Sequence, residues 1–164
     1  MDKYKFTAAE NQRFARANFT KLVHTNARFE GVNTTLPQTQ TIMDGMSVAG
    51  VPVEDVLTIV NLKRGWQYIT AQNSPLTLTM EKQINKIVAA EDALVPGELR
   101  QGKGGVNLGS DDFFEQPLIN EKQEQSFLQK ILADPRTTIT DKALTVMYHN
   151  MRQQIFWDGN KRTA

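Results

Sequence analysis

The sequence has 164 residues, enough for one soluble domain that builds its own hydrophobic core. Lys and Arg total 19 and Asp and Glu total 18, so the net charge of +1 lacks the basic excess of nucleic-acid-binding proteins. The absence of cysteine excludes disulfides, thiolate catalysis and cysteine-ligated zinc. There is no secretory signal at the start and no apolar run of about 20 residues. We therefore expect a cytoplasmic protein that binds neither nucleic acid nor membranes.

Apolar residues recur mostly at helical spacing, which predicts an all-α fold. Thr7 and Glu10 have the spacing of a capping box, in which two side chains satisfy the free N–H groups of a helix start. In the last predicted helix the apolar residues from Ile139 to Ile155 fall every four positions, and we expect that helix to be deeply packed. The predicted helices cover residues 7–29, 37–44, 52–70, 77–92, 120–133 and 138–155.

The segment from residue 96 to residue 117 differs from the rest of the chain. It contains five glycines and a single short apolar alternation at Val106, Asn107 and Leu108. Glycine-rich segments with alternating polarity favour turns and strands over helices. We predict a small β-hairpin within residues 97–110.

The most informative segment is the turn that follows the last helix. Asp158 supplies a carboxylate, Gly159 permits a positive φ, and Asn160, Lys161 and Arg162 supply an amide and two cations. Successive N–H groups in such a turn can bind an anion, and a carboxylate beside phosphate oxygens is a common magnesium site. The spacing alone is equally compatible with a polar corner between two helices that a glycine caps.

Three parts of the sequence together resemble the Fic/Doc family. Phe156 to Arg162 reads F-W-D-G-N-K-R and matches the core of the family motif H-x-F-x-(D/E)-(G/A)-N-(G/K)-R. Gly97 to Arg100 and Val106 to Gly109 resemble the G-x-x-R sequence and the hairpin flap that precede this motif. Phe29 to Gly31 resembles the end of the family's inhibitory helix motif, (S/T)-x-x-x-E-(G/N). The resemblance implies one mainly helical Fic-like domain over residues 1–164, with an inhibitory helix at 7–31 and a flap hairpin at 97–110.

The resemblance also implies an activity. Family members use ATP or another NTP with Mg²⁺ and usually transfer AMP to a Ser, Thr or Tyr hydroxyl of a target protein. The target segment adds as a strand to the flap. By position, Asp158 is the implied metal ligand and Glu30 the inhibitory residue. The implied phosphate-binding residues are Gly159, Asn160, Lys161 and Arg162, and the implied target-binding flap residues are Val106, Asn107, Leu108 and Gly109.

Gln154 occupies the position of the family's catalytic histidine. An amide does not accept a proton near neutral pH, although it can orient a hydroxyl by hydrogen bonding. Loss of a general base lowers a rate by about 10²–10⁴-fold. His149 lies five residues earlier on the same helix and turned away from Gln154, so we interpret it as structural.

Two further departures concern other parts of the motifs. Lys161 is typical of the Doc-like branch, whose members can transfer the terminal phosphate of a nucleotide, and Asn26 stands at the Ser/Thr place of the inhibitory motif. The sequence leaves three functions open: a weak AMP transferase, a catalytically inactive module that binds a nucleotide or a protein, and a Doc-like phosphotransferase. Family members continue from the motif into another core helix. We therefore expect a longer chain, or a second copy in a homo-oligomer or another chain that completes the fold.

Overall fold

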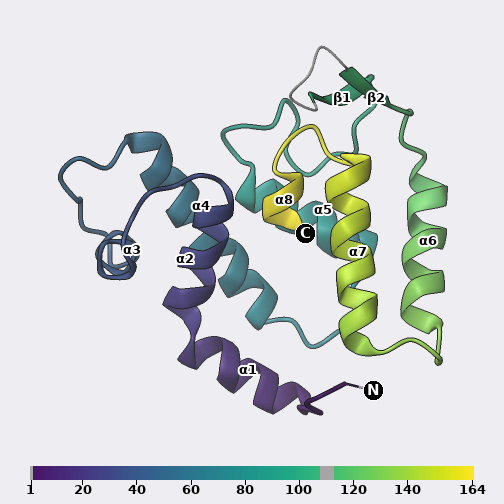
Figure 1. The fold of residues 1–164 in the computed structure, drawn as a ribbon, viewed down its shortest axis with the longest axis horizontal. Helices are drawn as coiled ribbons and strands as arrows, with labels where there is room; N and C mark the ends of the chain where they lie inside the picture. Colours follow the sequence, from purple (N-terminus) through teal and green to yellow (C-terminus); the bar gives the residue numbers. More distant parts are fainter. Residues whose placement is uncertain (1, 108–112) are drawn as a thin grey trace. The chain divides into compact units, whose positions relative to one another are not determined.

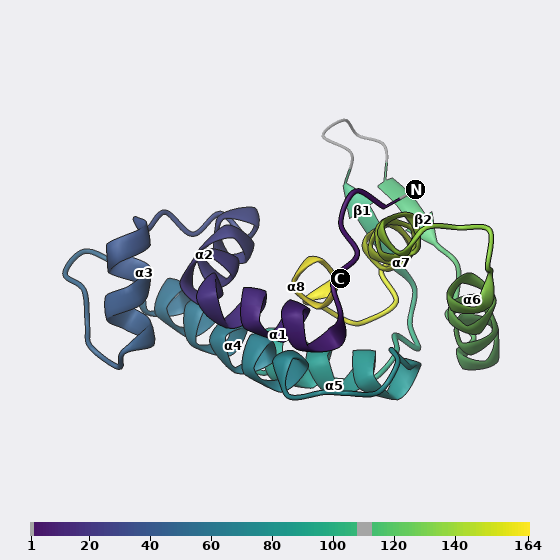
Figure 2. The same cartoon turned by 90° about the horizontal axis from the view of Figure 1, so that it is seen from below.

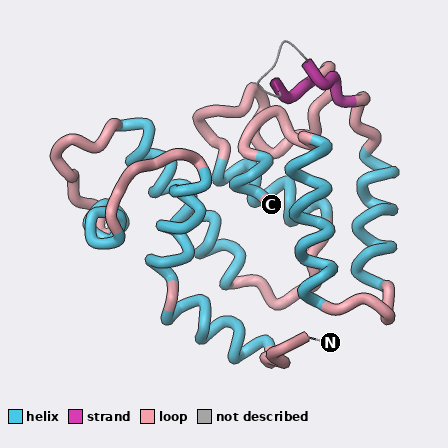
Figure 3. The backbone as a smooth tube through the Cα atoms, viewed as in Figure 1, coloured by secondary structure: helices cyan, strands magenta, loops and turns pink. Residues whose placement is uncertain are grey.

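The computed structural model describes residues 2–107 and 113–164, without the side chains of residues 104–114. The chain packs as two compact units, Tyr4–Ser74 and Pro75–Ala164, and Asp2 and Lys3 belong to the second unit. Helices dominate both units, and strands occur in one short hairpin (Figure 3). This confirms the predicted helical fold class with a small hairpin. Within the described residues no helix is long and apolar enough to span a membrane.

The first unit contains α1 (Ala8–Ala17), α2 (Phe19–Phe29), α3 (Leu36–Met43) and α4 (Val53–Thr70). The predicted capping box is present, because the N–H of Glu10 donates to Oγ1 of Thr7 at 3.3 Å and the N–H of Thr7 donates to Oε2 of Glu10 at 2.8 Å. The helix expected over residues 7–29 is instead two helices that meet at Asn18. The Asn18 side chain donates to the carbonyl of Phe14 at 2.9 Å, a local bond that competes with helix continuation.

The second unit contains α5 (Leu78–Val88), β1 (Gly104–Asn107), β2 (Phe113–Gln116), α6 (Glu121–Ala133), α7 (Ile139–Gln153) and α8 (Asn160–Thr163). α6 lies beside α7, while α8 packs against both α5 and α7 (Figures 1 and 2). The core of this unit gathers residues from α5, α6, α7 and the loops around the motif. Its buried members are Leu78, Leu99, Leu128, Val146, Ile155 and Phe156.

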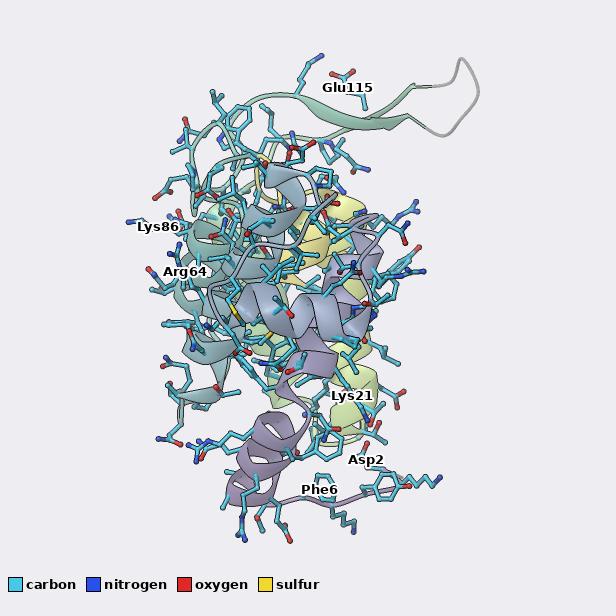
Figure 4. All side chains as sticks on the ribbon, turned by 90° about the vertical axis from the view of Figure 1, so that its left-hand side faces the viewer. Asp2, Phe6, Lys21, Arg64, Lys86 and Glu115 are labelled. Atoms are coloured by element: carbon cyan, nitrogen blue, oxygen red, sulfur yellow. The ribbon has the colours of Figure 1, made fainter. Side chains whose placement is uncertain are left out.

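β1 and β2 pair in antiparallel fashion, with Gly104 opposite Gln116 and Asn107 opposite Phe113. The second strand therefore lies beyond the range of 97–110 that the sequence predicts for the hairpin. Val106 and Asn107 belong to β1, whereas Leu108 and Gly109 lie outside the described residues. Glu115 of β2, which is labelled in Figure 4, forms an ion pair with Lys103 at 2.7 Å.

The prediction that the last long helix is deeply packed is wrong. The side chains of Ile139 and Tyr148 on α7 are 78% and 61% exposed, and within this helix Val146 and Asn150 are buried. Residues four apart are rotated by about 40° around a helix, so an apolar series of every fourth residue turns by about 160° over four steps. The predicted stripe therefore begins on the exposed face, with Ile139 and Met147, and is buried only at its last residue, Ile155.

Candidate functional site

The site begins where α7 ends, at Gln154. This residue has φ 50° and ψ 56°, and among the described residues it is the only non-glycine with a positive φ. A side chain in this left-handed region costs about 1–2 kcal/mol, and helices usually place glycine there. The fold thus retains a side chain in a backbone conformation that favours glycine.

The amide of Gln154 is held inside the turn. Its Nε2 donates to the carbonyl of Met151 at 2.6 Å, and its Oε1 accepts from Nδ2 of Asn160 at 3.1 Å. Asn160 also donates to the carbonyl of Phe156 at 3.0 Å and accepts from the N–H of Phe156 at 2.9 Å. Asn160 is buried, so its amide acts as the clamp that fixes the backbone between α7 and α8.

Asp158 presents a carboxylate that is fixed yet accessible. Its Oδ1 accepts from the N–H of Gly159 and from Nη2 of Arg162 at 3.4 Å, while the side chain remains 56% exposed. Within the described part of the chain, no group of three or more His, Cys, Asp or Glu residues could hold a metal ion. Asp158 suits a Mg²⁺ ion that takes one protein carboxylate and completes its shell with water and phosphate oxygens.

Gly159 and Arg162 hold this turn against α5. Gly159 has φ 68°, and a Cβ atom placed on it would lie 2.6 Å from Cβ of Ala89. The Arg162 side chain, 6% exposed, donates from Nη1 to the carbonyl of Val88 at 3.0 Å and pairs with Asp92. Both residues were predicted to bind phosphate, and the structure gives each of them a role in shaping the turn.

Asn85 of α5 is a site residue that the sequence analysis missed. Its Nδ2 donates to the carbonyl of Asp158 at 2.8 Å and to Oγ1 of Thr163 at 3.0 Å, and its Oδ1 accepts from the N–H of Gly97 at 2.9 Å. The side chain is fully buried. The sequence carries one signal of this role. Asn85 is a polar residue between the inward-facing Ile84 and Val88, and a buried amide needs hydrogen-bond partners.

Six predicted site residues belong to one turn of the second unit. The turn contains Gln154, Asp158, Gly159, Asn160, Lys161 and Arg162, with Lys161 exposed at the surface. Glu30 follows α2 in the first unit, and its pairing with a motif arginine stays a prediction. His149 is structural, as predicted: its Nε2 lies 2.6 Å from Oε2 of Glu124 and its ring stacks on Phe127.

A buried carboxylic acid lies on α5, one helical turn before Asn85. Glu81 of α5 is 4% exposed, and its Oε1 accepts from Nδ2 of Asn150 on α7 at 2.8 Å. Burial raises the pKa of the Glu81 carboxyl above its ordinary value of 4.5, the nearby Glu124 raises it further, and the Asn150 bond and His149 oppose the rise. The folded state therefore binds a proton more tightly at Glu81 than the unfolded chain does.

Stability from Glu81 is therefore greatest below pH 4.5 and is lost as the pH rises through its raised folded pKa. We expect Glu81→Gln, whose amide carries no charge, to gain stability relative to the natural protein as the pH rises from 4.5 to 8. Urea unfolding at several pH values measures this gain, with the 58% exposed Glu98 changed to Gln as the control. A Glu81→Gln difference that is the same at every pH would contradict the assignment.

Comparisons with known proteins identify the fold. No family model and no curated protein matches the sequence. Among solved structures, the chain is similar to a Fic domain containing signaling protein from Bacteroides thetaiotaomicron, with a TM-score of 0.78 and 18% identity over 96% of this chain and 63% of that one. It is also similar to a Fic family protein from Desulfovibrio desulfuricans G20, with a TM-score of 0.75 and 18% identity over 98% of this chain and 50% of that one.

A third similar structure is Fic-1 (residues 134–508) from C. elegans, with a TM-score of 0.73 and 17% identity over 99% of this chain and 49% of that one. The chain therefore spans between about half and two thirds of the length of these proteins. The arrangement of its helices is nevertheless matched almost from end to end. This protein has the Fic fold.

Proposed function

We propose that this chain carries a nucleotidyl-transfer site that joins AMP from ATP to a hydroxyl of a target protein. The rate of transfer is low because Gln154 cannot act as a general base. The observation that carries the proposal is the left-handed conformation of Gln154. A side chain is kept there at a cost in stability, and strained backbone of this kind concentrates at functional sites. The same residue occupies the histidine position of the Fic motif in the sequence.

The roles of the other residues follow from their surroundings. Asp158 would hold a Mg²⁺ ion on the nucleotide, because its carboxylate is positioned by Gly159 and Arg162 and more than half exposed. The ion would supply positive charge against the phosphate oxygens. Lys161, exposed at the start of α8, supplies charge for the phosphates together with the first N–H groups of that helix. The buried side chains of Asn160 and Arg162 hold the turn in its conformation through their hydrogen bonds.

The proton balance explains why we expect slow transfer. The target hydroxyl oxygen would bond to the α-phosphorus while the bond to pyrophosphate breaks, and the hydroxyl proton must leave. A histidine at position 154 would accept this proton, whereas the Gln154 amide only donates and accepts hydrogen bonds. In this site the proton would pass to water, without the contribution of a general base.

One observation favours the second candidate, a module that binds a nucleotide without transfer. Both ends of the Gln154 amide are engaged inside the turn, with Met151 and Asn160. In this arrangement the side chain stabilises the turn and presents less of its hydrogen-bonding capacity to a target hydroxyl. Both candidates require the same nucleotide site.

We expect calorimetry to detect binding of Mg²⁺–ATP, with an affinity that falls about tenfold or more in Asp158→Asn. The amide is a weaker metal ligand than the carboxylate, and a tenfold loss corresponds to about 1.4 kcal/mol. The difference should shrink when Mg²⁺ is removed. Glu98→Gln, which alters an acid of similar exposure (58% against 56%), is the control and should bind like the natural protein. Equal affinity in Asp158→Asn and the natural protein would rule out the proposed metal position.

A further inference from the structure

Arg100, from the loop between α5 and β1, has a guanidinium group that is almost fully buried. The residue is 3% exposed. Its Nε donates to the carbonyl of Gln154 at 3.0 Å, and its Nη2 donates to the carbonyls of Pro117 at 3.0 Å and Gln153 at 3.5 Å. Its Nη1 donates to the carbonyl of Gly102. The side chain thus contacts the end of α7 and both ends of the hairpin.

The main chain of Arg100 adds a fifth connection. Its N–H donates to the carbonyl of Ile155 at 2.9 Å, and the preceding Leu99 forms an isolated antiparallel bridge with Phe156. The segment before the flap therefore lies alongside the first residues of the motif. The backbone of residues 99–100 fixes the position of the guanidinium, and the guanidinium fixes the hairpin base.

The chemistry of this contact requires arginine. The four side-chain acceptors are main-chain carbonyls, two of which come from the end of α7, where helix carbonyls lack intrahelical partners. Burial lowers the pKa of the Arg100 guanidinium, which still remains charged because its ordinary value is so high. A planar fork with five N–H donors can serve carbonyls in several directions, whereas a lysine ammonium offers three donors from one point.

We propose that Arg100 is a positioning residue that ties both ends of the β1–β2 hairpin to the backbone of Gln154. This inference rests on the proposed function and on the flap that the sequence resemblance implies, where a target segment would add as a strand to the hairpin edge and its hydroxyl would reach position 154. A strand bound to the hairpin can place the hydroxyl correctly only if the hairpin base keeps a fixed distance from the turn. One side chain enforces this distance, because Gly102 precedes β1 and Pro117 follows β2.

Hydrogen exchange of the whole chain tests the proposal without relying on activity. In Arg100→Lys and Arg100→Met we expect the amides of residues 104–107 and 113–116, and that of Gln154, to exchange about tenfold to hundredfold faster, since several charge-assisted bonds are lost together. Amides in the middle of α6 should exchange as in the natural protein. Arg100→Lys retains the charge and serves as the milder variant if Arg100→Met fails to fold.

Leu128→Ala is the matched control, because it removes a core side chain of α6 and destabilises the unit without touching the hairpin base. It should speed exchange throughout residues 75–164. If the Arg100 variants show that same uniform increase, or no increase at the hairpin, Arg100 is an ordinary core residue and the proposal fails.

A second readout separates this proposal from the proposed function. In a Gln154→His background, Arg100→Lys should lower kcat for AMP transfer to a protein at least tenfold while leaving the Kd for Mg²⁺–ATP within twofold, because Arg100 contacts no residue assigned to the nucleotide. Loss of kcat and nucleotide affinity together would overturn the positioning role. Absence of transfer in every variant would overturn the proposed function, and the hydrogen-exchange result would still decide the role of Arg100.

Discussion

Gln154→His is expected to raise AMP transfer from ATP by about 10²–10⁴-fold, the usual contribution of a general base. Histidine tolerates the left-handed backbone of this position better than most side chains do. Its ring would stand at the end of α7, where the Gln154 amide now lies between Met151 and Asn160. The substitution therefore supplies a proton acceptor without demanding a new backbone conformation.

The measurement is incorporation of label from ATP marked at the α-phosphate into the protein itself or into a lysate. Glu30→Gly is included in all samples to remove the predicted inhibition. Gln153→His is the matched control, because it places the same ring one residue earlier on α7, and it should not increase transfer. ATP marked at the γ-phosphate tests the phosphotransferase alternative. Robust transfer by the Glu30→Gly protein that adding Gln154→His leaves unchanged would show that the missing base does not limit the reaction.

Gly159→Ala is expected to lower the free energy of unfolding by about 2–5 kcal/mol. The left-handed backbone contributes about 1–2 kcal/mol of this loss. Overpacking contributes about 1–3 kcal/mol more, because the new Cβ would lie 2.6 Å from Cβ of Ala89 and 3.3 Å from Nδ2 of Asn85. A substitution of Gly159 is therefore a probe of the fold and a poor probe of nucleotide binding.

Gly31→Ala separates the two contributions. Gly31 has φ 87°, and a Cβ atom there would meet no atom within 4 Å, so only the backbone cost applies. Urea unfolding of both variants, followed by circular dichroism, gives the comparison. If the two substitutions cost the same, the contact between the motif turn and α5 does not tighten the fold as we describe.

Local chemistry made most of the fold predictable. Capping residues such as Thr7 and Thr138 mark helix starts within a residue or two, and both accept the expected N–H bonds. The break at Asn18 was not predicted, because the apolar spacing continues across it and does not reveal the side-chain bond from Asn18 to Phe14. The exposure of Ile139 was missed for another reason. Which face of a helix is buried depends on its neighbours, which periodicity does not reveal.

The site was predicted as a linear motif, and its supports come from distant parts of the chain. Asn85 lies 73 residues from Asp158 in the sequence, and Arg100 lies 54 residues from Gln154. The local sequence around these two residues does not indicate their hydrogen-bond partners. Their role follows only from the way α5 and the hairpin base are folded against the motif turn.

The burial of Asn160 and Arg162 and the tight contact of Gly159 with Ala89 also bear on how such a sequence evolves. Selection for a stable fold alone would preserve glycine, asparagine and arginine at these positions, even in a lineage that has lost catalysis. Gln154 is half-buried and Lys161 is exposed, so burial constrains these two positions less, and they can change more readily while the rest of the motif persists. When activity is lost or changed in this fold, we therefore expect the first substitutions at positions 154 and 161.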